Sequence, residues 1–156
     1  MVTLRARLVP VAGFTTIELL VVVGILSIMA AFAGPALSSM VASQQVRSAS
    51  ADLHSSLTIA RSEALTRNGS VTIAPADGDW AHGWTVTEAG GTVLRRQPAY
   101  PRLTLSGPVR VIFNGDGRPD TTATPFAVSA TGAHANNYRC VRLRLNGRSA
   151  IDKGAC

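Results

Sequence analysis

Few residues in this 156-residue sequence offer catalytic or ligand-binding chemistry. Aromatic residues make up 5% of the chain, which argues against a large surface for stacked ligands. The three histidines, His54, His82 and His134, stand apart from any Ser/His/Asp order or nucleophile-elbow glycine pattern, and a phosphate-binding loop is absent. The sequence therefore predicts one non-enzymatic domain with a modest core and no cofactor.

Candidate metal ligands are equally scarce. The segment NGDGRPD, residues 114–120, alternates oxygen ligands with glycines, as calcium loops do, but it lacks their regular spacing and terminal glutamate. A turn between strands is the favoured interpretation of this segment, and a calcium loop is the alternative. No metal site is predicted.

One long apolar run lies near the N-terminus. Between Leu19 and Leu37 the single polar residue is Ser27. As a helix, this run would span about 28 Å, close to the thickness of the hydrocarbon core of a bilayer. The sequence therefore predicts a membrane-spanning helix half at residues 14–37.

The charges ahead of the run predict its orientation. The first 13 residues include Arg5 and Arg7 and no acidic residue. Basic residues favour the cytoplasmic side of a membrane, so residues 38–156 should be extracytoplasmic. A conventional secretory signal is cut after its apolar run, beside small residues. Here the small residue, Gly13, precedes the run.

The segment GFTTIEL, residues 13–19, resembles the prepilin signature of type IV pilins and type II secretion pseudopilins. The resemblance implies that residues 1–13 are a leader peptide, which prepilin peptidase removes by cutting between Gly13 and Phe14. The same membrane protease would methylate the new amine of Phe14. Glu18 would be the glutamate on which filament assembly depends.

The position of Glu18 fits this interpretation on physical grounds. An ionisable residue in a membrane helix is costly and is by default a functional-site candidate. Cleavage would place an ammonium group on Phe14, one helical turn away, and the amine of a neighbouring subunit is a second candidate partner. The alternative is a single-pass anchor in which Glu18 lies near the lipid headgroups.

Beyond the membrane the sequence predicts a pilin-like α+β fold. An amphipathic helix half continues through residues 38–68, and Asn68-Gly69 should end it. Proline removes a helical hydrogen bond, so a kink or a locally melted segment is expected at Gly34-Pro35. The apolar stripe of the helix comprises Val46, Ala49, Leu53, Leu57, Ala60 and Ala64.

Residues 69–156 should form a β domain, because their apolar residues follow a period of two. Seven short strands are predicted, in an antiparallel sheet that packs on Leu53 and Leu57. Asparagine and glycine pairs supply the turn chemistry of hairpins. The predicted strands are SVTIAP, GWTVTE, TVLRRQ, RLTLS, VRVIF, TPFAVSA and YRCVRLRL, and the turns are Gly90-Gly91, Asn114-Gly115 and Asn146-Gly147.

Two further segments, residues 60–75 (ARSEALTRNGSVTIAP) and 80–84 (WAHGW), are similar to the GspH/FimT family of minor pilins and pseudopilins. The resemblance implies a subunit held in the bacterial inner membrane with its C-terminal domain in the periplasm. An inner-membrane assembly platform would then move it into a filament with other pilin or pseudopilin subunits. Its role there would be to prime or cap a type IV pilus, and a type II secretion minor pseudopilin is the alternative.

The two cysteines, Cys140 and Cys156, are both expected in an oxidising compartment, which favours a disulfide. The bond would close a loop of about 15 residues, worth roughly 3 kcal/mol of stability in the chain-entropy model. Two free thiols or a metal site are the alternative, although neither a histidine nor a second cysteine pair completes a ligand set.

Basic residues outnumber acidic ones by 15 to 9, and several of them gather near the C-terminus. The resemblance adds that some FimT-like minor pilins bind DNA during natural transformation through a C-terminal Gly-Arg-x-Arg motif. The segment Gly147–Ala150 keeps only the first arginine of that motif. Double-stranded DNA is therefore a candidate partner, and a solvated strand face is the alternative. The candidate DNA-binding residues are Arg142, Arg144, Arg148 and Lys153.

Overall fold

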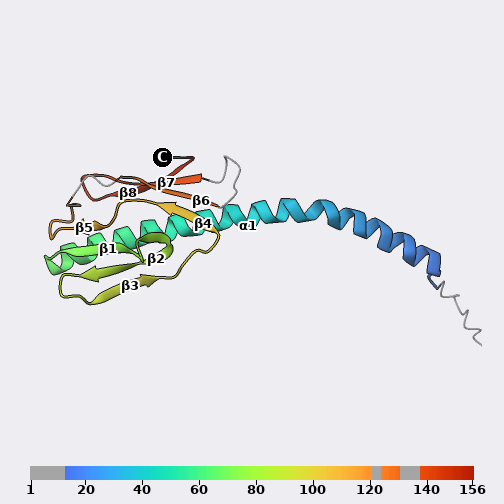
Figure 1. Cartoon of the computed structure of the whole chain (residues 1–156), viewed down its shortest axis with the longest axis horizontal. Coiled ribbons are helices and arrows are strands. Elements are labelled where there is room, and N and C mark those ends of the chain that lie inside the picture. Colours follow the sequence, from blue (N-terminus) through green and yellow to red (C-terminus); the bar gives the residue numbers. More distant parts are fainter. Residues whose placement is uncertain (1–12, 121–123, 131–137) are drawn as a thin grey trace, which may run out of the picture. The chain divides into compact units, whose positions relative to one another are not determined.

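The computed structural model describes residues 13–120, 124–130 and 138–156, and within residues 31–37 it describes the backbone alone (Figure 1). The predicted leader peptide lies outside the described residues, apart from Gly13. One helix precedes eight described strands, which confirms the predicted α+β class. The chain divides into two compact units, residues 1–37 and 38–156.

The helix α1 (Thr16–Arg67) is capped at both ends by the residues next to it. At its start, the hydroxyl oxygen of Thr15 accepts a hydrogen bond from the Glu18 N–H at 3.3 Å. At its end, Asn68 adopts a left-handed φ of 49°, and the Gly69 N–H donates to the Ala64 carbonyl oxygen at 3.1 Å. The predicted helix stop is therefore confirmed, with asparagine rather than glycine in the left-handed position.

The first unit contains the apolar start of α1. Between Gly13 and Ala30 every residue is exposed. Within the described residues, no helical stretch combines the length and the hydropathy that a membrane span requires. The last part of the predicted span, residues 31–37, lies outside the described side chains. The backbone stays helical at residues 34 and 35, so the locally melted segment expected there is not found: one lost hydrogen bond leaves the flanking turns intact.

The second unit has two four-stranded antiparallel sheets where the sequence predicted one. The first has the order β3-β2-β1-β5, and the second has the order β4-β6-β7-β8. The strands of the first sheet are β1 (Val71–Ala76), β2 (Asp79–Glu88), β3 (Val93–Gln97) and β5 (Val111–Phe113). Those of the second are β4 (Leu103–Ser106), β6 (Phe126–Ala130), β7 (Tyr138–Leu143) and β8 (Ser149–Lys153).

Strand β8 is the strand that the sequence did not predict. Its segment SAIDK has one large apolar residue, Ile151, which is 40% exposed. The strand exists because it pairs with β7 over five positions, from Leu143 opposite Ser149 to Arg139 opposite Lys153. Pairing of this kind is made by backbone hydrogen bonds, so it requires no alternation of apolar and polar side chains that the sequence could show.

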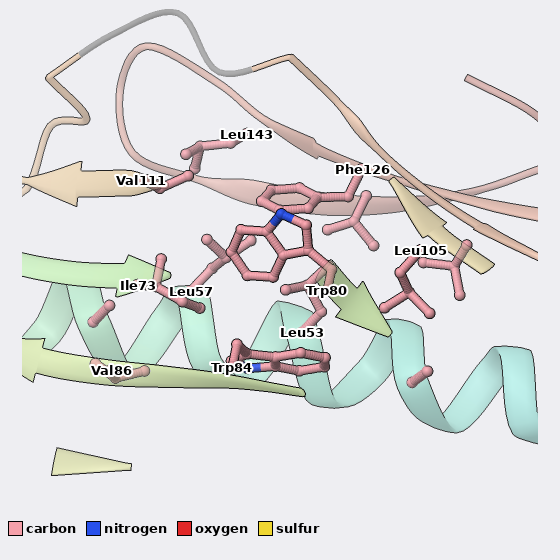
Figure 2. Packing of buried hydrophobic residues seen from close by; sticks show 14 of the residues in the cluster. Leu53, Leu57, Ile73, Trp80, Trp84, Val86, Leu105, Val111, Phe126 and Leu143 are labelled. Atoms are coloured by element: carbon pink, nitrogen blue, oxygen red, sulfur yellow. The ribbon is translucent and has the colours of Figure 1, made fainter. Parts of the chain in front are cut away.

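Both sheets and the second half of α1 enclose one hydrophobic core. The predicted helix stripe is buried, and Leu53 and Leu57 contact the core as expected. The two tryptophans of β2 lie at its centre (Figure 2). The Trp80 ring meets Phe126 of β6 edge-on at 4.9 Å, and Trp84 stacks on Tyr100 at 5.9 Å. The buried core residues all lie between positions 46 and 143, so residues 38–156 form a folding unit of their own.

Candidate functional site

The predicted cleavage site lies in non-helical backbone ahead of α1. Gly13, Phe14 and Thr15 precede the first helical residue, and Phe14 is 79% exposed. A Cβ placed on Gly13 would have no neighbour within 4 Å. A peptide that lies outside regular secondary structure and is not packed against the fold is accessible to a protease. The local geometry is therefore compatible with cleavage between Gly13 and Phe14.

Glu18 lies in the first turn of α1, three residues after the cap formed by Thr15. Threonine at the cap and glutamate three residues later are the sequence pattern of a capping box. A carboxylate at this position is also favoured by the partial positive charge of the helix N-terminus. This capping pattern was present in the sequence, and the structure shows one of its two hydrogen bonds, from the Glu18 N–H to the Thr15 hydroxyl.

The predicted disulfide is present between Cys140 and Cys156, whose Cα atoms are 5.0 Å apart. Cys140 is fully buried on β7, and the sulfur of Cys156 lies 3.2 Å from the carbonyl oxygen of Phe126 on β6. The bond therefore fastens the segment after β8 to the second sheet. Neither of the alternatives, two free thiols or a metal site, applies to this pair.

The four candidate DNA-binding residues do not form one patch. Arg142 pairs with Asp152 on the neighbouring strand, with an Nε to Oδ2 distance of 3.1 Å. Lys153 lies at the far end of the β7–β8 hairpin, opposite Arg139. The structure brings together Arg144 and Arg148, which flank the turn between the two strands.

A second turn repeats the geometry of the β7–β8 turn. Each turn consists of five residues, 114–118 and 144–148. In both, the backbone N–H of the first residue donates to the carbonyl oxygen of the fifth residue, with an N to O distance of 2.9 Å. The backbone N–H of the fourth residue donates to the carbonyl oxygen of the first residue at 2.8 Å. The predicted Asn114-Gly115 and Asn146-Gly147 pairs both lie in these turns. The fourth residue is a left-handed glycine, so in the first turn that position falls at Gly117 rather than Gly115. In both turns the side-chain oxygen of the third residue accepts a hydrogen bond from the backbone N–H of the fifth residue. These pairs are Asp116 with Arg118 and Asn146 with Arg148.

The two turns pack against each other and against α1. Arg61 on the helix donates from Nε to the carbonyl oxygen of Gly117 at 3.1 Å. Gly147 lies against the same carbonyl oxygen, and a Cβ there would overlap it. The sequence shows that both turns contain glycine before arginine, but it does not show that they meet.

We call the exposed arginines of these turns, Arg118, Arg144 and Arg148, the arginine tip. Leu145 lies among them and is 65% exposed. Arg118 has a weak ion pair with Asp116 at 3.8 Å, whereas Arg144 and Arg148 have none within the described ranges. The arginine tip therefore combines free positive charge with an apolar side chain on a fixed backbone.

Two further polar contacts join α1 to the β domain, one to strand β8 and one to the segment between β3 and β4. His54 Nδ1 lies 2.8 Å from the hydroxyl oxygen of Ser149 on β8. Tyr100 donates from its hydroxyl to Asp52 Oδ2 at 2.7 Å, and burial, followed by this hydrogen bond, raises the pKa of Tyr100. Neither contact includes a third group that would complete a catalytic triad, as far as the described residues show.

The remaining two histidines are not part of a catalytic or metal-binding site in the part of the chain that the structure describes. His82 is exposed on β2, and His134 lies outside the described residues. Over the described part of the chain, no cluster of three or more His, Cys, Asp or Glu side chains could hold a metal ion. The segment predicted as a turn rather than a calcium loop forms the first of the two turns above.

Comparison with known proteins supports the resemblance inferred from the sequence. Residues 49–148 match the family described as Type II transport protein GspH. Two crystal structures of the type IV minor pilin FimU from Pseudomonas aeruginosa PAO1, in space groups P21 and P65, share the fold. The first has a TM-score of 0.60 and 23% identity over 70% of this chain and 89% of FimU. The second has a TM-score of 0.58 and 25% identity over 68% of this chain and 91% of FimU.

The search of curated protein sequences found no match. The family match nevertheless covers more than half of the chain and includes the second half of α1, the strands of the first sheet and both turns of the arginine tip. Both similar solved structures are of a type IV minor pilin and share the fold of this chain. The chain therefore belongs to the GspH family of type IV minor pilins and pseudopilins.

Proposed function

We propose that this chain is a minor type IV pilin, a filament subunit that primes or caps pilus assembly. Prepilin peptidase cuts between Gly13 and Phe14 and methylates the new amine of Phe14. The subunit is then held in the bacterial inner membrane by residues 14–37, with residues 38–156 in the periplasm. The inner-membrane assembly platform moves it from there into a filament with other pilin subunits.

The observation that carries the proposal is an open cleavage segment followed by an unpacked apolar helix. Phe14 is 79% exposed, and the large apolar side chains from Ile17 to Met29 are exposed as well. An apolar surface of this extent indicates an interaction with a membrane or with other proteins. Lipid covers it before assembly, and the helices of neighbouring subunits cover it afterwards.

Glu18 gives the assembled helices their register. Cleavage creates an ammonium group on Phe14, one residue before the cap of α1, so each subunit has a cation and a carboxylate at the same helix end. An apolar environment makes an unpaired charge costly, and only one axial position of a neighbouring helix brings its amine to Glu18. The charge pair therefore specifies position more than it adds stability.

Mass spectrometry of purified filaments tests the processing step. The wild-type subunit should begin with methylated Phe14, whereas Gly13→Glu should keep the leader and stay out of filaments. Any other mature N-terminus in the wild type contradicts the proposal.

Incorporation is tested with a second pair of variants. Glu18→Val should be inserted and cleaved normally but should be lost from the filament fraction, since it cannot pair with a neighbouring amine. Ile17→Val, in the same helical turn, is the control and should enter filaments as the wild type does. Equal incorporation of both variants would assign Glu18 to the lipid interface instead.

A type II secretion minor pseudopilin is the second candidate, favoured by the description of the matching family. Its processing and helix chemistry would be the same. Deletion of the chain separates the two possibilities. Loss of surface pili with normal protein secretion supports the pilin, and loss of secretion with normal pili supports the pseudopilin.

DNA binding during DNA uptake is a third candidate, and the arginine tip favours it. Arg144 and Arg148 lie on one turn, and the packing of Gly117 against Gly147 brings Arg118 to the same end of the domain. Guanidinium groups at such a surface bind phosphates without reading the base sequence. Titration of double-stranded DNA with the isolated domain at low salt is the direct measurement.

A further inference from the structure

An open hollow of about 230 Å³ lies between the turn that joins β1 to β2 and the segment that follows β4. The arginine tip adjoins the C-terminal end of α1, where Gly117 contacts Leu65. From there β1 runs to its turn with β2 (Figure 1). Gly78 and Asp79 of that turn line the hollow. Its lining comes from residues 78–80 and residues 105–109. The volume suits one or two inserted side chains rather than a cofactor.

The loop on one side of the hollow is held firmly. Trp80 donates from Nε1 to the carbonyl oxygen of Pro108 at 2.8 Å. Gly107 packs on the ring of Phe126 so closely that a Cβ would overlap it. This support presents Val109 at 88% exposure, above the other large apolar side chains of the described residues. The hollow therefore has a fixed apolar rim.

The rim of the hollow carries the carboxylate of Asp79, at the turn between β1 and β2. Asp77 lies two residues earlier in the chain, and Arg110 directly follows Val109. One carboxylate oxygen of Asp79 accepts a hydrogen bond from the Ala81 N–H at 2.8 Å. Within the described residues the other oxygen has no hydrogen-bond or ion-pair partner.

The arginine tip has the complementary character. Leu145 projects from a turn whose backbone is fixed by its own hydrogen bonds and by the second turn. Arg144 and Arg148 flank it, with free guanidinium groups. A fixed apolar side chain between cations matches an apolar hollow with a carboxylate on its rim. Both surfaces belong to the same chain, so a second copy is a suitable occupant.

We infer that the arginine tip of one copy docks into the hollow of a second copy, with Leu145 against Val109 and Arg148 beside Asp79. The inference rests on the proposed filament function. Because the two surfaces are different parts of one domain, the contact is heterologous, or head-to-tail, rather than a two-fold symmetric dimer. The area is small, so the contact is weak alone and becomes effective when α1 packing holds subunits at high local concentration.

Disulfide trapping in the isolated domain, residues 38–156, tests the contact without requiring cleavage or filament entry. One population has Leu145→Cys and the other has Val109→Cys, while the native cysteines remain bonded to each other. Mixed at about 1 mM under mild oxidation, the two should form a mixed dimer. As the control, Val93→Cys on β3 replaces Val109→Cys, because Val93 is also exposed. This pair should form little mixed dimer.

Charge reversal supplies the decisive comparison. Arg148→Glu in the first population, or Asp79→Arg in the second, should lower the mixed-dimer yield about tenfold, and combining both should restore it. Arg96→Glu, on β3, is the matched control and should change nothing. No mixed dimer, or two charge reversals that do not rescue each other, would overturn the inference. Either result would leave the processing and incorporation of the subunit unaffected.

Discussion

The packing of Gly147 against Gly117 makes a quantitative prediction about the stability of the domain. Gly147 has a φ of 76°, which costs about 1–2 kcal/mol for an alanine. Its Cβ would also overlap the Gly117 carbonyl oxygen, which accepts the hydrogen bond from Arg61. Overpacking of this kind costs typically about 1–3 kcal/mol. Gly147→Ala should therefore lower the free energy of unfolding by roughly 2–5 kcal/mol.

Gly91 provides the matched control, because it separates backbone strain from the clash. Its φ is 86°, and a Cβ there would have no neighbour within 4 Å. Gly91→Ala should therefore cost only the strain, about 1–2 kcal/mol. The assay is urea denaturation of the oxidised isolated domain, followed by circular dichroism. If the two variants lose equal stability, the turns do not press on each other and the reasoning for a fixed arginine tip fails.

Three further predictions concern the disulfide, the polar contact to α1 and the arginine tip. Cys156→Ser should lower the stability of the domain by about 2–5 kcal/mol, and thiol titration of the unfolded, unreduced wild type should find no free thiol. Tyr100→Phe should cost about 1.5–3 kcal/mol in the same denaturation assay, because it removes a hydrogen bond to the charged Asp52, and an unchanged midpoint would contradict this. Arg144→Gln with Arg148→Gln should remove most of any low-salt DNA binding and reduce the log–log salt slope by about two, and an unchanged slope would exclude the arginine tip.

The helical part of the fold was predictable because its signal is local. Leu53 and Leu57 follow a period set by the helix itself, and all six members of the predicted stripe are buried. The stop at Asn68 was equally local, since it depends on the conformation of one residue. In such features the spacing of residue types along the chain follows directly from the local backbone geometry. A single sequence is therefore enough to find them.

The division into two sheets and the arginine tip were not predictable in this way. Strand β8 has little alternation, and its existence depends on pairing with β7. The two glycine-arginine turns lie 30 residues apart in the chain, and their meeting requires both sheets and Arg61 to be in place. For the same reason the sequence grouped Arg142 and Lys153 with Arg148, whereas pairing across the hairpin separates them.

The position of the two tryptophans gives the domain an intrinsic optical reporter. Trp80 and Trp84 are the chain's only tryptophans, and both are buried at 3% exposure or less. The Trp80 ring touches Phe126, so it lies where residues of the first sheet meet the second. An event that parts the sheets but keeps each one intact would shift the fluorescence emission to the red while the far-ultraviolet spectrum stays constant. Such a separation could therefore be followed in the unlabelled protein.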